Sequence, residues 1–217
     1  MWKGDPRSAG VKTRSSLIPP AVPSVISHHW GYSRVMPQVT PDTGGVGLIL
    51  KALEFAARKH RDQRRKDKRA SPYINHPIQL AQVLWEEGGV ADPVAIAAAL
   101  LHDTIEDTET SLQELRGDFG DEVADIVLEV TDVKWIKKSL RKRLQVARAR
   151  HASERAKLVK LADKIVNLRD VAAHPPANWS LERRREYFDW AKEVIDRLRG
   201  AHPELERRFD EAYALKP

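Results

Sequence analysis

From about residue 48 onward, apolar residues recur at the spacing of a helix face rather than in the alternation typical of a strand. A nearly continuous apolar stretch at 93–101 predicts a buried helix. Two longer segments predict amphipathic helices, marked by Leu158, Leu161, Ile165 and Leu168 in one and by Tyr187, Trp190, Val194 and Leu198 in the other. The pattern therefore predicts an all-α fold without an internal repeat.

Several residues mark where these helices begin. Pro77 suits the first turn of a helix, and Asp92 followed by Pro93 caps the buried one. Ser111 and Glu114 have the spacing of a capping box, which predicts a further helix start.

Glycines and prolines indicate where the helices end. We expect breaks at 88–89 and 119–120, and a Pro-rich loop at 172–178 before the last long helix. The first helix is expected to present the apolar face Leu50, Leu53 and Ala57.

Residues 1–45 lack this periodicity. They contain many prolines, serines and glycines, and their acids are Asp5 and Asp42 alone. This composition predicts a disordered tail at 1–45 and a single helical domain at 46–217. The tail has neither an amphipathic helix nor the apolar centre of a secretory signal, so we expect no targeting peptide. A translation start at Met36 would leave the helical domain whole.

The composition is compatible with a soluble globular domain. With 217 residues, 41% of them hydrophobic, the chain is long enough for one domain with a sizeable core. No apolar run approaches the roughly 18 residues of a membrane span. Cysteine is absent, which excludes disulfides, thiolate metal ligands and cysteine nucleophiles. We therefore expect a cytoplasmic protein whose chemistry uses nitrogen and oxygen ligands.

The net charge of +6 raises nucleic-acid binding as a rival function. However, 37 basic residues are offset by 31 acidic ones, so most of the charge is expected to be solvated surface. The stretches 58–69 and 134–150 are more basic. If they face a substrate cleft, they attract phosphates; if they face outward, they solubilise the protein or contact RNA. We expect no nucleic-acid partner.

Four ionisable residues follow the buried apolar stretch: His102, Asp103, Glu106 and Asp107. A buried carboxylate or imidazole is costly unless it is paired or bound to a metal. So dense a cluster beside a buried helix predicts a bound ion or a catalytic task.

Two other segments supply further ligands. His76 lies at a helix start, and Asp163 shares a helical stripe with Asn167 and Asp170, which indicates a cleft wall. The nearby Lys157, Lys160 and Lys164 are expected to face solvent. The set of two imidazoles and two carboxylates, with no sulfur, favours Mn²⁺, with Fe²⁺ or Zn²⁺ as alternatives. Its members are His76, His102, Asp103 and Asp163.

Each of these residues also has an ordinary structural interpretation. His76 alone would be a helix-capping histidine, Asp163 alone an ion-pair residue, and Glu106 and Asp107 solvated acids. The co-occurrence of the segments favours a site. If the helix continues past His102, Glu106 would also stack on that histidine one turn later.

Three segments carry a family resemblance. They are YINHP at 73–77, ALLHDTIEDT at 99–108 and LVKLADKIVNLR at 158–169, supported by RRKD at 64–67 and EYFDW at 186–190. In this order they resemble the HD-domain hydrolases of the RelA/SpoT type, and most of all the small single-domain alarmone hydrolases that include the metazoan SpoT homologues. The resemblance covers about residues 50–200.

The resemblance implies an HD-domain helical bundle and a Mn²⁺-dependent hydrolase that removes the 3′-pyrophosphate of guanosine tetra- or pentaphosphate (ppGpp or pppGpp). The implied metal ligands are His76, His102, Asp103 and Asp163, and the implied catalytic residues are Glu106 and Asp107. The implied substrate-binding residues are Arg65, Lys66, Lys138, Asn167, Arg183 and Tyr187, although the segment around Lys138 departs from the family pattern.

Alternatives remain within and outside the enzymes. The same site could remove the 2′-phosphate of NADPH or cleave another nucleotide phosphate, because metal-assisted hydrolysis does not itself select the leaving group. A non-catalytic nucleotide-sensing or RNA-binding module is the third interpretation. There is no glycine-rich phosphate loop, so side chains and the metal must hold the phosphates. We expect the synthetase domain of the long bifunctional relatives to be absent.

Overall fold

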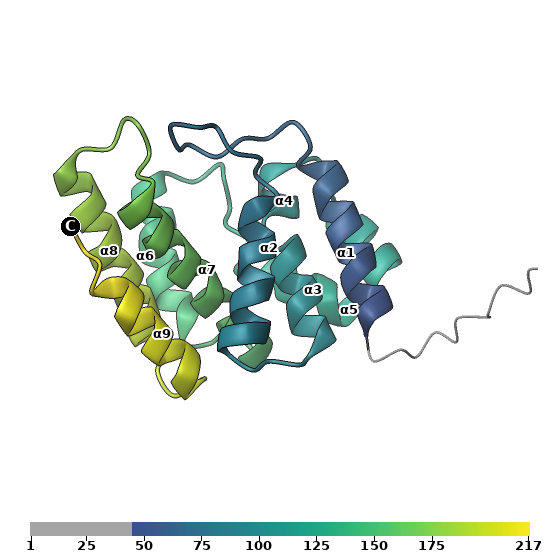
Figure 1. Ribbon diagram of the computed structural model, residues 1–217. Helices are drawn as coiled ribbons and strands as arrows, with labels where there is room; N and C mark the ends of the chain where they lie inside the picture. Colours follow the sequence, from purple (N-terminus) through teal and green to yellow (C-terminus); the bar gives the residue numbers. More distant parts are fainter. Residues whose placement is uncertain (1–44) are drawn as a thin grey trace, which may run out of the picture. The chain divides into compact units, whose positions relative to one another are not determined.

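The computed structural model describes residues 45–217, and in this part of the chain the regular elements are all helices (Figure 1). They are α1 (Val46–Lys59), α2 (Asn75–Gln82), the π-helix η1 (Val83–Glu87), α3 (Pro93–Leu101), α4 (Thr104–Asp107), α5 (Leu112–Val130), α6 (Lys138–Ala149), α7 (Glu154–Ala173), α8 (Leu181–Asp196) and α9 (Pro203–Tyr213).

The predicted all-α fold is confirmed. Extended pairing within residues 45–217 is limited to one isolated bridge between Arg64 and Pro72. None of the described helices combines the length and apolar character needed to cross a bilayer. The tail predicted at 1–45 lies outside the described residues, apart from its last position.

Helix α7 is the centre of the bundle. It packs against α2, α3 and α5 on one side and against α8 and α9 on the other, while α1 packs on α3 and α6 on α8 (Figure 1). The large side chains of Phe55, Phe188 and Phe209 are fully buried. Each such burial contributes about 1.5–3 kcal/mol relative to exposure. The site-bearing helices α2, α3 and α7 are thus held by a continuous core.

Helix α3 is buried as its apolar sequence predicts. Every residue from Ala95 to Leu101 is buried, and the helix start is capped by Asp92, whose carboxylate accepts a hydrogen bond from the backbone N–H of Val94 at 2.9 Å. The alanines leave little side-chain bulk, so neighbouring helices approach α3 closely. The end of α3 is therefore fixed at the centre of the domain.

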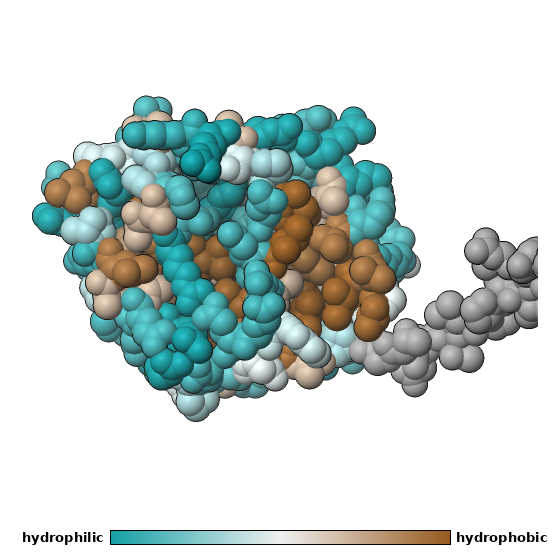
Figure 2. All heavy atoms as spheres, viewed as in Figure 1, coloured by the Kyte–Doolittle hydropathy of each residue, from teal (hydrophilic) through white to brown (hydrophobic). Residues whose placement is uncertain are grey.

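The apolar face predicted for the first helix is wrong. Ala52, Phe55 and Ala56 face the core, whereas Leu50 is 59% exposed and Leu53 and Ala57 are only partly buried. Figure 2 shows the resulting apolar side chains on the surface over α1. Both faces of α1 are apolar, and the alanine face is selected because it fits closely against α3.

The expected helix start at Ser111 and the break at Gly120 are confirmed, whereas α7 continues through Ala173 into the loop expected at 172–178 and α8 ends at Asp196, before Leu198. Ser111 accepts a hydrogen bond from the Glu114 N–H at 3.1 Å, and Gly120 interrupts α5 with a φ of 81°. The sequence pattern did not reveal α9. This helix begins after His202, whose Nδ1 accepts from the Leu205 N–H, and has Pro203 in its first turn.

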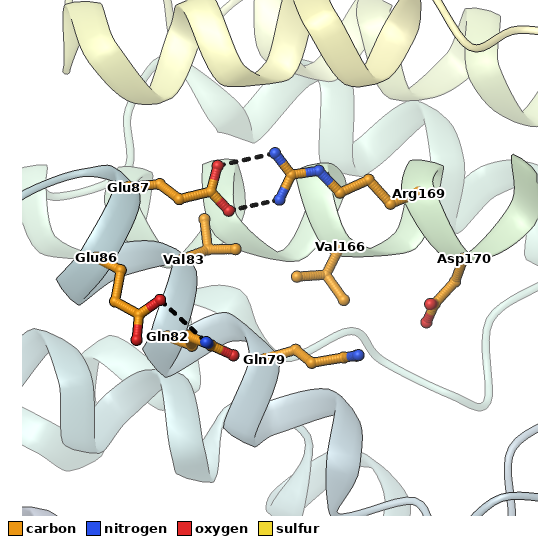
Figure 3. Close-up of a pocket in the computed structure, with 8 residues that line it drawn as sticks. All are labelled: Gln79, Gln82, Val83, Glu86, Glu87, Val166, Arg169 and Asp170. Carbon is orange, nitrogen blue, oxygen red and sulfur yellow. Dashed lines mark hydrogen bonds and ion pairs between the residues drawn. The ribbon is translucent and has the colours of Figure 1, made fainter. Parts of the chain in front are cut away.

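Ion pairs of Glu87 join the π-helix η1 to α7 and α9. Glu87 receives two hydrogen bonds from Arg169 of α7, at 2.6 and 2.8 Å, and Arg208 of α9 lies 3.4 Å away. The pair lines a small polar recess of about 230 Å³ (Figure 3). The Glu87 carboxylate thus links η1 to both α7 and α9. Because it already pairs with two guanidinium nitrogens of Arg169, it is unsuited to bind a metal.

Gly88, which follows η1, has no room for a larger side chain. A Cβ at Gly88 would lie 2.9 Å from both Leu205 Cδ2 and the Leu84 carbonyl oxygen. Gly88→Ala should therefore lower the free energy of unfolding by about 1–3 kcal/mol, measured by urea denaturation.

Gly117 is the matched control. It lies inside α5, and within the described residues nothing approaches its Cβ position within 4 Å. Gly117→Ala should raise the free energy of unfolding by about 0.5–1 kcal/mol. Equal effects of the two substitutions would show that the contact with α9 does not constrain Gly88.

Candidate active site

A cavity of about 940 Å³ opens beside the junction of α3 and α4. Its walls come from the loop after α1, from α2, α4 and α7, and from the Pro-rich loop before α8. Most of the predicted site residues line it: His76, Asp103, Glu106, Asp107, Asp163, Arg65, Lys66, Asn167 and Tyr187. His102 lies behind Asp103 and is 6% exposed.

Three helices bring the four predicted metal ligands together. His76 is in the first turn of α2, His102 and Asp103 follow the last residue of α3, and Asp163 is in the middle of α7. Asp163 Oδ1 lies 3.3 Å from His76 Nε2 and 4.0 Å from His102 Nε2. Ligand atoms of His76, His102 and Asp103 all lie within 4.8 Å of one another.

The donor set fits a divalent metal ion. His102 Nδ1 lies 2.9 Å from the Ala99 carbonyl oxygen, so this nitrogen carries a proton and Nε2 is the ring atom that faces the carboxylates. Within the described part of the chain that buried Nε2 has no hydrogen-bond partner, although Asp103 Oδ2 is only 2.9 Å away. Nitrogen and carboxylate lone pairs that face one another require either a shared proton or a metal cation between them.

The pKa values of the cluster reflect the negative charge of its two carboxylates. Burial lowers the pKa of both histidines, but the carboxylates of Asp103 and Asp163 overcome this at His102 and raise its pKa to about 9. Burial raises the pKa of Asp103, yet the His102 imidazole outweighs it and leaves the pKa below its ordinary value. A divalent cation would take the place of the proton on His102.

Neighbouring side chains hold the two carboxylates in place. The Tyr73 hydroxyl donates to Asp103, and Asn167 Nδ2 donates to Asp163 Oδ1 at 2.5 Å. Lys164 Nζ lies 2.8 Å from the other oxygen, Asp163 Oδ2. Each carboxylate thus has a donor besides the histidines that limits its rotation.

Lys164 corrects an expectation, because it does not face solvent. Its side chain is 7% exposed, and its ammonium group lies 4.6 Å from the ring centre of Trp190 as well as beside Asp163. Burial alone would lower its pKa, but the Asp163 carboxylate raises it above the ordinary value. The long aliphatic stem lets a lysine turn inward to a carboxylate on its own helix.

Glu106 and Asp107 lie side by side on α4 in different environments. Asp103 interrupts the helix (φ −102°, ψ 1°), so Glu106 does not stack on His102 in a continuous α3. Its carboxylate instead accepts from the Asp132 N–H at 3.1 Å, and Arg141 lies 3.4 Å away. Burial, followed by the Asp103 charge, raises the pKa of Glu106 to about 7.

Asp107 receives donors on both carboxylate oxygens. Gln63 Nε2 donates to Oδ2 at 2.9 Å, and the Lys134 ammonium group contacts Oδ1. These partners lie 44 and 27 residues away in the sequence. The local pattern around 102–107 therefore gave no signal for Gln63 or Lys134, whereas Tyr73 was part of a motif segment.

The predicted substrate-binding residues form two groups. Arg65, Lys66, Asn167 and Tyr187 line the cavity, and Arg65 is held by Asp170 at 2.5 Å. Lys138 and Arg183 are not lining residues but lie beside Trp179, which is one. The Arg183 guanidinium is 4.7 Å and the Lys138 Nζ 6.0 Å from that ring centre.

One part of the cavity lining is rich in basic residues. Burial, together with the nearby charges of Arg183, Lys142 and Lys66, lowers the pKa of Lys138. The first basic stretch supplies most of the lining cations: Arg64, Arg65, Lys66, Lys68 and Arg69. Of the basic residues in the second stretch, Lys134 lines the cavity. Converging positive charge outside a metal site is suited to a ligand that carries several phosphates.

Comparison with known proteins identifies the family of this chain. The family model described as HD domain matches residues 52–189. A guanosine-3′,5′-bis(diphosphate) 3′-pyrophosphohydrolase MESH1 of Xenopus tropicalis is 52% identical over 166 residues, which are 76% of this chain and 93% of the relative. The human MESH1 of the same description is 54% identical over 158 residues, or 73% and 88% of the two chains.

A solved structure is similar over a comparable share of the chain. It is described as a metazoan ortholog of SpoT that hydrolyzes ppGpp, and it superposes with a TM-score of 0.75 at 47% identity, covering 77% of this chain and 94% of the other. The family model spans the residues that line the cavity, and the chain belongs to the MESH1 family of HD-domain hydrolases.

Proposed function

We propose that the protein hydrolyses guanosine tetra- and pentaphosphate at the 3′-position, giving GDP or GTP and pyrophosphate. The main supporting observation is the convergence of two imidazoles and two carboxylates at a cavity whose lining is in part rich in basic residues. The MESH1 relatives are named for this reaction. In this reaction a water oxygen bonds to the phosphorus next to the 3′-oxygen, the P–O3′ bond breaks, and a proton passes to the departing oxygen.

His76, His102, Asp103 and Asp163 are proposed to hold one divalent ion, Mn²⁺ by preference and Fe²⁺ or Zn²⁺ as alternatives. Once bound, such an ion supplies Lewis acidity to a phosphoryl oxygen and to water. Tyr73, Lys164 and Asn167 keep the two carboxylates oriented toward it. The proposed metal ligands are therefore already oriented before the substrate binds.

Glu106 and Asp107 are proposed to divide the proton transfer. Glu106, with its pKa near 7, is able to hold a proton and give it to the departing 3′-oxygen. Asp107 accepts hydrogen bonds from Gln63 and Lys134, so it presents a fixed acceptor that orients the attacking water. Arg65, Lys66 and Arg183 are proposed to contact the phosphates, and Tyr187 the ribose or phosphates.

Removal of the 2′-phosphate of NADPH is a second candidate. Both reactions place a phosphate on a ribose secondary oxygen beside the metal position. A cavity of about 940 Å³ is at the upper end of the usual range for ligand pockets, roughly 300–1,000 Å³, and leaves room for a dinucleotide. The substrate assay below therefore includes NADPH.

The first prediction concerns the bond that is cleaved. With Mn²⁺ and guanosine 3′,5′-bispyrophosphate in ¹⁸O-water, the protein should release GDP and pyrophosphate in equal amounts, with the label in pyrophosphate alone. Attack at phosphorus puts the water oxygen there, whereas C–O cleavage would label GDP. Mass spectrometry of both products distinguishes the two.

Other products would change the assignment. Release of two orthophosphates would mean stepwise removal and contradict the proposed leaving group. No reaction with the guanosine nucleotide, together with phosphate release from NADPH, would favour the second candidate.

The second prediction separates metal binding from catalysis. Asp103→Ala removes a proposed ligand and should abolish both metal retention and hydrolysis. Glu106→Gln should retain the metal but lose most of kcat, because it changes proton transfer with little change in volume. Metal content after dialysis and initial rates are the measurements.

Asp121→Ala is the control, since this side chain is 81% exposed on α5. It should retain the metal and full activity. Normal metal retention in Asp103→Ala would remove Asp103 from the proposed ligand set.

The third prediction uses the raised pKa of Glu106 in the metal-free protein. Its folded-state pKa of about 7 lies above its ordinary 4.5, so the folded state holds more protons between these values. The stability contribution of this proton is therefore lost as the pH rises through that window. Relative to the wild type, Glu106→Gln should become more stable from pH 4.5 to 7, by on the order of 1 kcal/mol after solvent screening.

Urea denaturation at several pH values measures this difference. Glu109→Gln, at an exposed glutamate just after α4, is the control and should show no such trend. Parallel pH profiles for the wild type and Glu106→Gln would contradict a raised pKa.

A further inference from the structure

We propose that His60 and Gln63 form a hydrogen-bonded relay that orients the Asp107 carboxylate, which makes both of them positioning residues for the hydrolysis. The inference deepens the proposed function, because it rests on the role given there to Asp107. His60 is a buried histidine outside the proposed metal cluster.

The relay begins at the end of α1. His60 follows the last residue of this helix and is 2% exposed. Its Nδ1 lies 2.6 Å from Gln63 Oε1, and Gln63 Nε2 lies 2.9 Å from Asp107 Oδ2. The chain between them is a tight turn, in which the Gln63 N–H donates to the His60 carbonyl oxygen at 2.9 Å.

The chemistry of the three groups sets the direction of these hydrogen bonds. A carboxylate accepts only, so the Gln63 amide must present its NH₂ group to Asp107. Its oxygen then faces His60, and a hydrogen bond forms there only if His60 carries a proton on Nδ1. With a bare Nδ1, the ring lone pair would face the amide oxygen, or the amide would turn its oxygen toward Asp107. The relay therefore requires the Nδ1–H form of His60.

The surroundings keep both residues from moving. The His60 ring packs on Tyr73, with 4.8 Å between ring centres, and the Tyr73 hydroxyl donates to Asp103. The Tyr73 N–H also donates to the Gln63 carbonyl oxygen at 3.1 Å. Tyr73 thus holds the proposed metal ligand Asp103 through its hydroxyl. It also holds His60 through its ring and Gln63 through its backbone N–H.

The relay has a specific consequence for Asp107. With Oδ2 held by Gln63, Oδ1 is directed toward Lys134 in the cavity wall. Without Gln63, the carboxylate keeps only the contact with Lys134, whose side chain is 52% exposed, and is free to rotate with it. A misplacement of about 1 Å in a proton-transfer group can cost on the order of 100-fold in rate.

The kinetic test compares two substitutions of His60 that differ in one donor. His60→Phe keeps a ring against Tyr73 but lacks the Nδ1–H group, whereas His60→Asn offers an amide N–H near the position of Nδ1. With guanosine tetraphosphate and Mn²⁺, the Phe variant should lose about 10- to 100-fold in kcat with KM within about twofold. The Asn variant should recover most of that loss. Equal losses in both variants would overturn the relay.

The double substitution tests whether the effect passes through Asp107. Gln63→Met should lower kcat about as much as His60→Phe does, and Gln82→Met is the matched control at an exposed glutamine of α2 that pairs with Glu86. In an Asp107→Asn background, Gln63→Met should have no further effect, because the group that it positions is already inactive. A full additional loss there would overturn the inference.

A measurement without turnover keeps the inference separate from the proposed function. In the folded wild-type protein, long-range ¹H–¹⁵N spectra of the histidine rings should show His60 as the Nδ1–H form, assigned by the missing signal in His60→Asn. The Nε2–H form would overturn the relay even if the enzyme is active. Absence of turnover in the wild type, with the Nδ1–H form present, would instead count against the proposed function. The spectrum also decides the case if His60→Phe does not fold.

Discussion

The need to neutralise two carboxylates inside the domain determines how the site is built. Asp103 and Asp163 come from different helices, and burial acts against the ionised form of both. A buried charge without a partner costs several kcal/mol. His102, Lys164 and the Tyr73 hydroxyl supply part of the compensation. Ligand atoms of His76, His102 and Asp103 lie within 4.8 Å of one another, and Asp163 Oδ1 lies 3.3 Å from His76 Nε2, so the cluster is suited to a cation.

This requirement explains the arrangement of the bundle around it. The ligand atoms must meet to within a few ångströms, so α2, α3 and α7 cannot shift relative to one another. The alanine-rich α3 allows close packing on both sides, and α7 is enclosed by the other helices. Because a densely packed interior has low compressibility, the core keeps these three helices, and the side chains they carry, at fixed positions. The side-chain contacts of Tyr73 and Asn167 then orient the carboxylates.

Sequence reasoning succeeded where the determining interactions are local. The apolar run at 93–101, the Asp92 cap and the stripe from Asp163 to Asp170 depend on spacing within one helix, and all are present in the structure. It failed where tertiary packing decides between local alternatives. Leu50 is exposed because α1 has a second, better-fitting apolar face, and Lys164 is buried because Trp190 and Asp163 receive its stem and charge. No spacing rule connects residue 63 with residue 107.

The adjacent acids of α4 show how the same scaffold separates two functions. Glu106 and Asp107 differ by one position, and an α-helix directs consecutive side chains about 100° apart. Glu106 therefore turns toward Asp132 and Arg141, where desolvation and the Asp103 charge favour its protonated form. Asp107 turns toward the cavity wall, where Gln63 and Lys134 supply donors to an acceptor. The proposed acid and the proposed acceptor are thus neighbouring residues that the short helix exposes to different partners, and the break at Asp103 sets the orientation of that helix.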